Sequence, residues 1–260
     1  MEQYTSDESD GEPYTSYNIH DAARCADVPA LQIFLAEGDS PDVLSDNPDW
    51  RNQRTPLHEL CMYNDRMGND ESDRMACFEL LREAGANLEA RVGRHPQGST
   101  VIHYASDSGS PRILSLLIEA GVNVNVANSG GYTPLHWAAR GDFSRALECV
   151  ELLLKAGAAV NAKATSQTQL GSTPFAIALR RGENRRMWPL FLRAGAEIPV
   201  PNNMSNPDPY ILRVQSAGGY RKYAQNHLAR MSKLFVANGR RLPPEVVRQI
   251  MKFCLHLGYY

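Results

Sequence analysis

The sequence predicts an all-α solenoid of about five helix-turn-helix repeats with a helical C-terminal cap, and three observations lead to this fold class. A Thr-Pro-Leu-His-like element recurs along the chain, and Thr followed by Pro is typical of a helix start. Leucine, isoleucine and valine recur after it at helical spacing. Glycines follow the second helix of each unit, where they can adopt the left-handed conformation that ends a helix. These glycines are Gly38, Gly85, Gly121, Gly157 and Gly195.

The segment 131–161 is the most regular of these units. Gly131 permits the left-handed backbone of a tight turn. Thr133 can cap the first helix with its hydroxyl, and Pro134 follows it at a position that needs no backbone N–H. The second helix carries apolar residues at helical spacing, namely Leu147, Val150, Leu153 and Leu154.

The residues from Thr133 to Ala138 match the T-P-L-H-x-A signature of the ankyrin repeat at every position, and the segment resembles that family. The corresponding elements of the other repeats begin at Ile19, Thr55, Thr100 and Thr173. The resemblance therefore covers about residues 17–200, in five successive repeats.

The repeats are longer than the family's usual 33 or so residues, since their terminal glycines are 47, 36, 36 and 38 residues apart. An insertion at 63–74 separates the two helices of repeat two, and the segments 39–54, 86–99 and 158–172 are long. The resemblance implies that such segments are fingers projecting beside a concave face.

Both flanks differ from the repeats. Residues 1–16 are acidic and polar, which predicts a disordered tail. Prolines predict a linker at 201–209, and a basic helical segment follows at 210–260, with helices at 210–217, 220–236 and 242–257. Its stretch LPPEVVRQIMKF resembles the SOCS box and the opening of an F-box through one Leu-Pro and an amphipathic helix. A three-helix cap on the last repeat explains the same residues.

The net charge of −2 hides a strong polarity. Residues 1–90 carry 20 acidic and 6 basic side chains, whereas residues 91–260 carry 9 and 21. No apolar run approaches the roughly 18 residues of a membrane span, and the acidic first residues are unlike a signal peptide. Five scattered cysteines predict reduced thiols and an intracellular protein, cytoplasmic or nuclear.

No pattern indicates catalysis. Histidines 20, 58, 103 and 136 recur at one place in the repeat, where the resemblance implies that the imidazole bonds the backbone of a neighbouring loop. His58, Cys61 and Cys77 lack the fourth convergent ligand of a zinc site, and free buried thiols are the alternative. Because no nucleophile elbow, P-loop or dinucleotide fingerprint occurs, we expect neither enzymatic activity nor a cofactor or metal. We do not expect nucleic-acid binding, since the aromatic residues of the basic half form no base-stacking motif.

The resemblance implies which side chains face the concave groove: the position after the signature histidine and those beyond the paired alanines. In this chain these positions are Tyr63, Tyr104, Asp107, Trp137, Arg140, Arg180 and Arg181. Tyrosine, tryptophan and arginine dominate binding hot spots, although the rings could instead pack between inner helices. The cluster of arginines 180, 181, 185 and 186 could receive an acidic segment or be a solvated helix end.

Two functions follow as expectations. The first is a non-catalytic interaction module or adaptor that binds a partner protein in the concave groove. The second is the substrate-recognition subunit of a cullin-type ubiquitin ligase that docks through residues 205–260. An exposed apolar face on residues 242–257 would favour docking, whereas a buried face would favour the cap.

Overall fold

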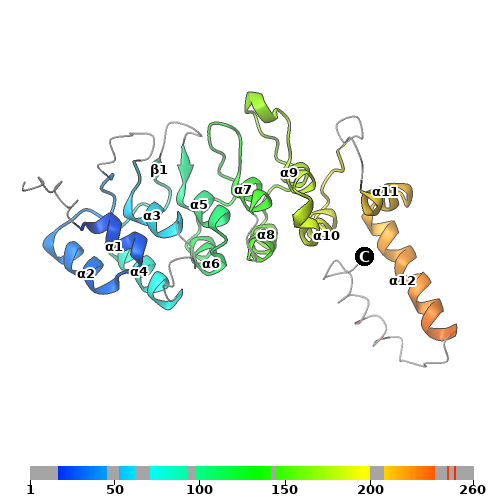
Figure 1. Cartoon of the computed structure of the whole chain (residues 1–260), viewed down its shortest axis with the longest axis horizontal. Coiled ribbons are helices and arrows are strands. Elements are labelled where there is room, and N and C mark those ends of the chain that lie inside the picture. The colour runs from blue at the N-terminus through cyan, green and yellow to red at the C-terminus, as the bar shows by residue number, and fades with distance from the viewer. Residues whose placement is uncertain are drawn as a thin grey trace, which may run out of the picture.

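Five helix pairs stack side by side in the computed structural model, as Figure 1 shows. The structure describes residues 17–45, 53–62, 71–92, 98–141, 145–199 and 208–237, together with the isolated positions 245 and 249. The first helices of the pairs are α1 (Ile19–Cys25), α3 (Pro56–Met62), α5 (Val101–Ser108), α7 (Pro134–Arg140) and α9 (Pro174–Arg180). The second helices are α2 (Val28–Glu37), α4 (Glu71–Glu83), α6 (Pro111–Glu119), α8 (Ala146–Lys155) and α10 (Trp188–Arg193).

The helices form two layers, because each helix contacts its partner and the equivalent helices of neighbouring pairs. The inner layer runs α1, α3, α5, α7, α9, and the outer layer runs α2, α4, α6, α8. A solenoid of this kind buries its core only between neighbours. The largest fully buried side chains lie between the layers and include Phe78, Leu114, Leu135, Phe175 and Phe191. The predicted all-α solenoid of five repeats is confirmed.

The helix ends follow the predicted chemistry. Thr100, Thr133 and Thr173 are N-caps with extended backbone. All five glycines predicted to end repeats have positive φ, between 81° and 100°. An L side chain rarely adopts this region, so these positions specify the length of each second helix.

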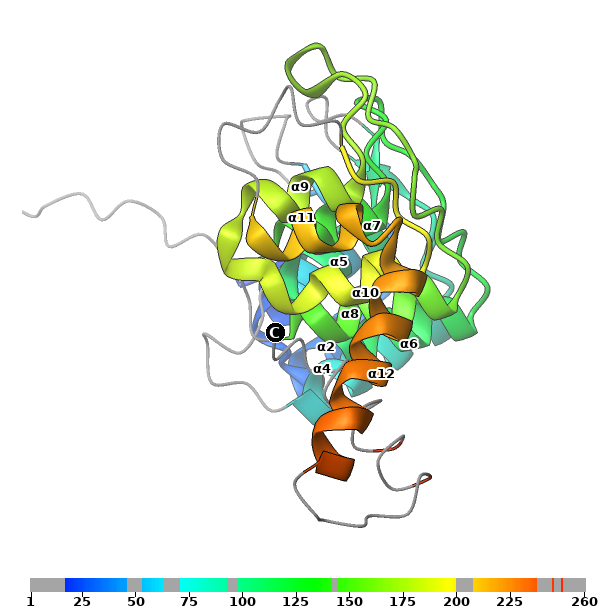
Figure 2. The same cartoon turned by 90° about the vertical axis from the view of Figure 1, so that its right-hand side faces the viewer.

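The fingers project from the inner layer, along the upper edge in Figure 1. One of them contains a short antiparallel pair, β1 (Arg91–Val92) with β2 (Ser99–Thr100). The finger at 158–172 holds a turn of 3-10 helix, η3 (Gln167–Gln169). Figure 2, viewed along the array, shows the loops of successive repeats lying over one another.

Two parts of the sequence interpretation are corrected. The sequence predicts residues 71–74 in the insertion, but they form the first turn of α4, and the Arg74 guanidinium donates to the Leu60 carbonyl of α3. It also predicts Pro209 in the linker, but Pro209 is the first residue of α11 (Pro209–Ser216), with Asp208 as its N-cap. In repeat five a 3-10 helix, η4 (Gly182–Met187), joins α9 to α10.

The C-terminal cap consists of α11 and α12 (Tyr220–Ala237), close to the two helices predicted there. Tyr210 stacks on Trp188 of α10 with a centroid distance of 6.4 Å, and Tyr223 contacts Tyr210 edge-on at 5.6 Å. Val214 is fully buried behind them. The predicted tail at 1–16 and the helix at 242–257 lie outside the described residues, apart from the two isolated positions.

Candidate functional site

Six of the seven predicted groove residues lie on, or directly after, three consecutive inner helices. Tyr104 and Asp107 are on α5, Trp137 and Arg140 are on α7, and Arg180 is the last residue of α9. Arg181 follows it at the start of η4. Tyr63 lies outside the described residues. The stacking of repeats therefore places these side chains in adjacent rows on the inner layer.

An aromatic row crosses the inner layer. The Tyr104 and Trp137 rings meet at 5.5 Å and an angle of 65°, and Tyr104 also contacts His58 edge-on at 5.3 Å. Edge-to-face geometry at this separation is favourable for aromatic rings. Trp137 is only 7% exposed, so much of its ring packs against the repeats, whereas Tyr104 is half-buried.

Arginines cover the open faces of this row. The Arg140 guanidinium lies 5.0 Å from the centroid of the Trp137 ring, and its Nη2 is 2.9 Å from Asp107 Oδ1 of the preceding repeat. Arg54 lies 5.7 Å from the Tyr104 centroid. Cation–π contact and an ion pair together fix the orientation of Arg140.

A hollow of about 210 Å³ lies between α7, α9 and the finger that contains η3. Trp137, Arg140, Arg180 and Arg181 line it, so four of the predicted residues converge on one place. Its other lining residues are Tyr132, His136, Gln169 and Ile177. Sequence reasoning missed Tyr132 and Gln169 because they belong to fingers, although the unusual length of the 158–172 segment was a signal.

Two polar side chains of the hollow have well-defined local environments. Arg180 Nη2 donates to Ser172 Oγ at 2.8 Å. Gln169 Oε1 is buried and has no hydrogen-bond partner among the described residues. Buried polar atoms are rarely left unpaired in folded proteins, so the Gln169 amide is a candidate ligand contact.

The predicted arginine cluster divides into two parts. Arg180 and Arg181 face the hollow, whereas Arg185 lies 2.6 Å from Asp208 and stacks over Trp188 at 5.4 Å. Arg185 therefore connects repeat five to the start of the cap. Arg186 is exposed.

Three of the four signature histidines contact the backbone of a neighbouring loop, and His20 Nε2 lies 2.9 Å from Val43 O. The exception is His58, whose Nε2 is buried without a hydrogen-bond partner among the described residues. His103 Nδ1 accepts from Thr100 N at 3.1 Å, and its Nε2 lies 3.0 Å from Tyr132 O in the next repeat. His136 repeats this pattern, with Thr133 N at 3.0 Å and Ser172 O at 3.2 Å. Because Nδ1 accepts, Nε2 carries the proton and the imidazole is neutral. Burial lowers the pKa of both histidines from 6.5 to about 4.

Equivalent side-chain oxygens link the inter-repeat turns. Asp42 accepts from Asn87 N at 2.9 Å and Glu89 from Asn123 N at 3.4 Å. Asn125 Oδ1 accepts from Ala159 N at 2.7 Å, and its Nδ2 donates to Gly157 O at 3.2 Å. Asn161 bonds the next turn in the same two ways, through Glu197 N and Gly195 O. This row holds the fingers at a fixed spacing.

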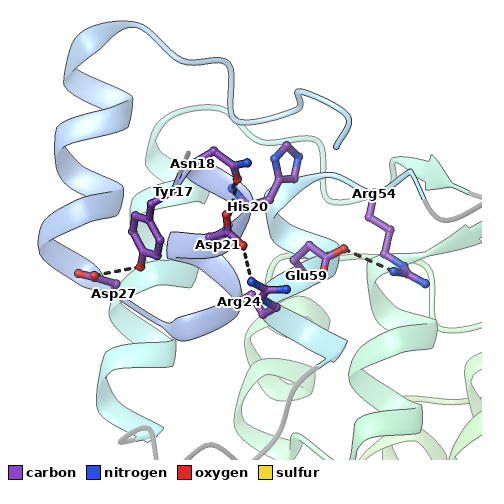
Figure 3. Close-up of polar contacts among 8 residues, drawn as sticks. All are labelled: Tyr17, Asn18, His20, Asp21, Arg24, Asp27, Arg54 and Glu59. Carbon is purple, nitrogen blue, oxygen red and sulfur yellow. Dashed lines mark hydrogen bonds and ion pairs between the residues drawn. The ribbon is translucent and has the colours of Figure 1, made fainter. Parts of the chain in front are cut away.

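The first two repeats have their own polar contacts, shown in Figure 3. The Tyr17 hydroxyl lies 3.0 Å from Asp27 Oδ2, and Asn18 Oδ1 accepts from two backbone N–H groups at the start of α1. Arg54 lies 3.4 Å from Glu59 and so connects the entry of α3 to its first turn. These contacts stabilise the acidic end of the inner layer.

Cys61, Cys77 and Cys149 are buried free thiols, and burial raises the pKa of each to about 12. Among the described residues no group of three or more histidine, cysteine or acidic side chains could hold a metal ion. No described helix is long and apolar enough to cross a membrane.

Comparison with known proteins agrees with the repeat architecture. A family model described as "Ankyrin repeats (3 copies)" matches residues 67–164. The putative E3 ubiquitin-protein ligase XBAT31 of Arabidopsis thaliana is 31% identical over 163 residues, 57% of this chain and 31% of that protein. The human ankyrin repeat and SOCS box protein 16 is 36% identical over 106 residues, 41% of this chain and 21% of that protein. The chain thus covers less than a third of the length of either relative.

Proposed function

Because this chain is an ankyrin-repeat protein, we propose that it is a non-catalytic interaction module that binds a partner protein on its inner layer and fingers. Ankyrin repeats act in protein–protein interaction, which supports the general role. The choice of binding surface rests on the convergence of Trp137, Arg140, Arg180 and Arg181 around one hollow.

Physical properties of this surface support binding. Arg140 is held by Asp107 and by the Trp137 ring, so little side-chain entropy remains to be lost when a partner docks. Aromatic and arginine side chains in a concave setting are the usual anchors of an interface. The backbone around them belongs to packed helices, which supplies a rigid frame.

The test is affinity purification from cells with quantitative mass spectrometry. We would compare the full chain with R140E/R181E, which reverses two charges at the hollow and leaves the buried core intact. Proteins bound through this surface should fall by about tenfold or more in that variant, a change equivalent to about 1.4 kcal/mol.

The matched control is R82E/K155E, which reverses two exposed charges on the outer helices α4 and α8. Partners should be retained by the control. If both variants retain the partner proteins equally, the binding surface does not include the hollow. If no protein is enriched over an empty tag, the proposal of an adaptor fails.

The second candidate is the substrate-recognition subunit of a cullin-type ubiquitin ligase. The names of the two relatives above, one an E3 ligase and one a SOCS box protein, favour it. Tyr210 and Val214 pack on repeat five, so within 205–260 the stretch 238–260 is our candidate dock.

A variant truncated after Ala237 distinguishes the two candidate functions, because it lacks residues 238–260 but keeps α11 and α12 on the last repeat. Loss of cullin-associated subunits from this shortened chain, with other partners retained, would support the ligase role. The same partners with both chains, and no ligase subunit with either, would contradict it.

A further inference from the structure

The hollow beside α7 and α9 combines cationic, apolar and amide groups. We propose that it binds an acidic peptide segment of the partner, with a carboxylate between Arg180 and Arg181 and an apolar side chain beside Trp137 and Ile177. This inference rests on the proposed function and names the chemistry of its partner. Its basis is three independent features of the described residues.

The first feature is the charge balance of the lining. Arg140 forms an ion pair with Asp107, with 2.9 Å between Nη2 and Oδ1. Arg180 is held by the neutral Ser172 hydroxyl, and neither it nor Arg181 has an ion-pair partner among the described residues. Both are exposed and line the hollow, and no acidic side chain of the described residues forms an ion pair with either. Guanidinium groups bind carboxylates with charge-assisted hydrogen bonds.

The second feature is the unpaired Gln169 amide. The Gln169 side chain lines the hollow, and its Oε1 is buried without a hydrogen-bond partner among the described residues. If the amide rotates toward the hollow, its oxygen can accept from a peptide backbone N–H, or its NH2 group can donate to a peptide carbonyl. A peptide therefore supplies the contact that the finger lacks.

The third feature is the size and polarity of the space. A volume of about 210 Å³ holds one or two side chains. Trp137 and Ile177 form its apolar part and are 7% and 8% exposed. The Asp107 carboxylate, which is paired with Arg140 of the lining, disfavours a continuous line of phosphates, so a peptide with separated charges fits better than a nucleic-acid backbone.

The net charge of the chain supports the same occupant. Residues 91–260, which contain the hollow, carry 21 basic and 9 acidic side chains. A positive half of this kind attracts acidic segments and raises their association rate at low ionic strength. We therefore expect binding to weaken as salt increases.

The experiment uses two fluorescein-labelled peptides, Gly-Ser-Glu-Glu-Leu-Glu-Glu-Ser-Gly and the same peptide with glutamine for every glutamate. Fluorescence anisotropy with the full chain measures the affinity of each. The acidic peptide should bind about tenfold more tightly than its glutamine counterpart. R180Q/R181Q should remove that advantage, whereas the control R82Q/K155Q should keep it.

A second variant tests the amide. Q169L keeps all charges and removes the polar group, so it should weaken both peptides by about threefold or more. Circular dichroism melting of each variant separates a local loss of binding from unfolding. Because R180Q and R181Q alter exposed side chains, their melting should match that of the unchanged protein.

Several results would overturn the inference. They are equal binding of both peptides, unchanged affinity in R180Q/R181Q, or tighter binding of a ten-nucleotide oligothymidine than of the acidic peptide. A further variant replaces the five acidic residues of 1–16 by their amides in the full chain. If this variant binds the acidic peptide more tightly than the unchanged protein does, the chain's own tail occupies the hollow. If R140E/R181E loses its cellular partner while the acidic peptide fails to bind, the proposed function stands and only this chemistry is wrong.

Discussion

The two connecting histidines, His103 and His136, show how one side chain can join two repeats. Each accepts a backbone N–H at Nδ1 and donates from Nε2 to a carbonyl of the next repeat. A second proton would have to bind Nδ1, where the threonine N–H already points. Acid therefore breaks the helix start and leaves a charged ring among apolar neighbours.

The first prediction concerns this proton. An unfolded histidine titrates near pH 6.5, whereas burial lowers the pKa of His136 to about 4. Between these values the unfolded chain binds the proton and the folded chain does not, so stability is full above about pH 6.5 and falls toward pH 4. H136Q should reduce the slope of unfolding free energy against pH by about 1.4 kcal/mol per pH unit in this window. Urea unfolding at several pH values gives both slopes.

The stability of H136Q at neutral pH is the reference for its stability in acid. Glutamine cannot reproduce both hydrogen bonds, so the variant should be about 1–2 kcal/mol less stable than the unchanged protein at pH 7. Its disadvantage should then shrink as the pH falls. Parallel stability curves for the two proteins would show that His136 does not titrate on unfolding.

At the scale of the structural element, the finger that carries Gln169 is held by a turn of the preceding finger. Asn128 Oδ1 accepts from Gly130 N and Tyr132 N, at 3.0 and 3.1 Å. The Gly130 carbonyl in turn accepts from Thr165 N and Ser166 N at 2.8 and 3.0 Å. One finger therefore determines the path of the next.

Gly131 permits this close approach, and it provides the second prediction. Its φ is 72°, and a Cβ there would lie 2.6 Å from Thr165 N. G131A should therefore cost about 2 kcal/mol or more, from backbone strain and from displacement of the finger. Gly157 has a similar φ of 85° but open space around a Cβ, so G157A should cost only about 1 kcal/mol.

Chemical denaturation measures these two costs, and hydrogen exchange shows where they act. G131A should lower protection of the backbone at Thr165 and Ser166, whereas G157A should leave it unchanged. Equal costs for the two variants would mean that the contact with Thr165 is unimportant.

At the scale of the whole molecule, stability depends on nearest neighbours and on the two ends. The C-terminal end of the described solenoid is covered by α11 and α12, as the right-hand side of Figure 1 shows. Trp188 and Tyr210 stack there, and they are 3% and 7% exposed. Removing that contact exposes repeat five without touching the others.

The third prediction follows from this arrangement. Y210A deletes a buried ring and should cost about 3 kcal/mol. Because coupling runs between neighbours, hydrogen exchange should rise in residues 174–199 and stay near its original rate in α1–α4. Uniform loss of protection along the chain would instead indicate a single cooperative unit.

Much of the fold could be predicted because each repeat encodes it locally. The terminal glycines and the Thr-Pro helix starts depend on residues close in sequence, and the connecting histidines recur at one position of the repeat. Long-range choices could not be predicted. The pairing of Arg185 with Asp208 removes that arginine from the predicted cluster, and no repeat pattern relates two residues on either side of α10.

The candidate site divides in the same way. Trp137, Arg140, Arg180 and Arg181 occupy periodic positions, so the repeat pattern placed them on one surface. Gln169 follows no period, because its position depends on hydrogen bonds from its finger to Gly130. Helical periodicity does not extend into fingers, and their lining residues were missed for that reason.

The row of side-chain oxygens between turns has a mechanical consequence. Asn125 and Asn161 each form two bonds across their junction, one accepted and one donated. At Asp42 and Glu89 a carboxylate can only accept, so among the described residues these two positions lack the bond that each asparagine amide donates. Resistance to bending should therefore increase along the solenoid. Repeats three to five should form a rigid unit around the hollow. Repeats one and two should bend more easily and so adapt to the shape of a larger partner.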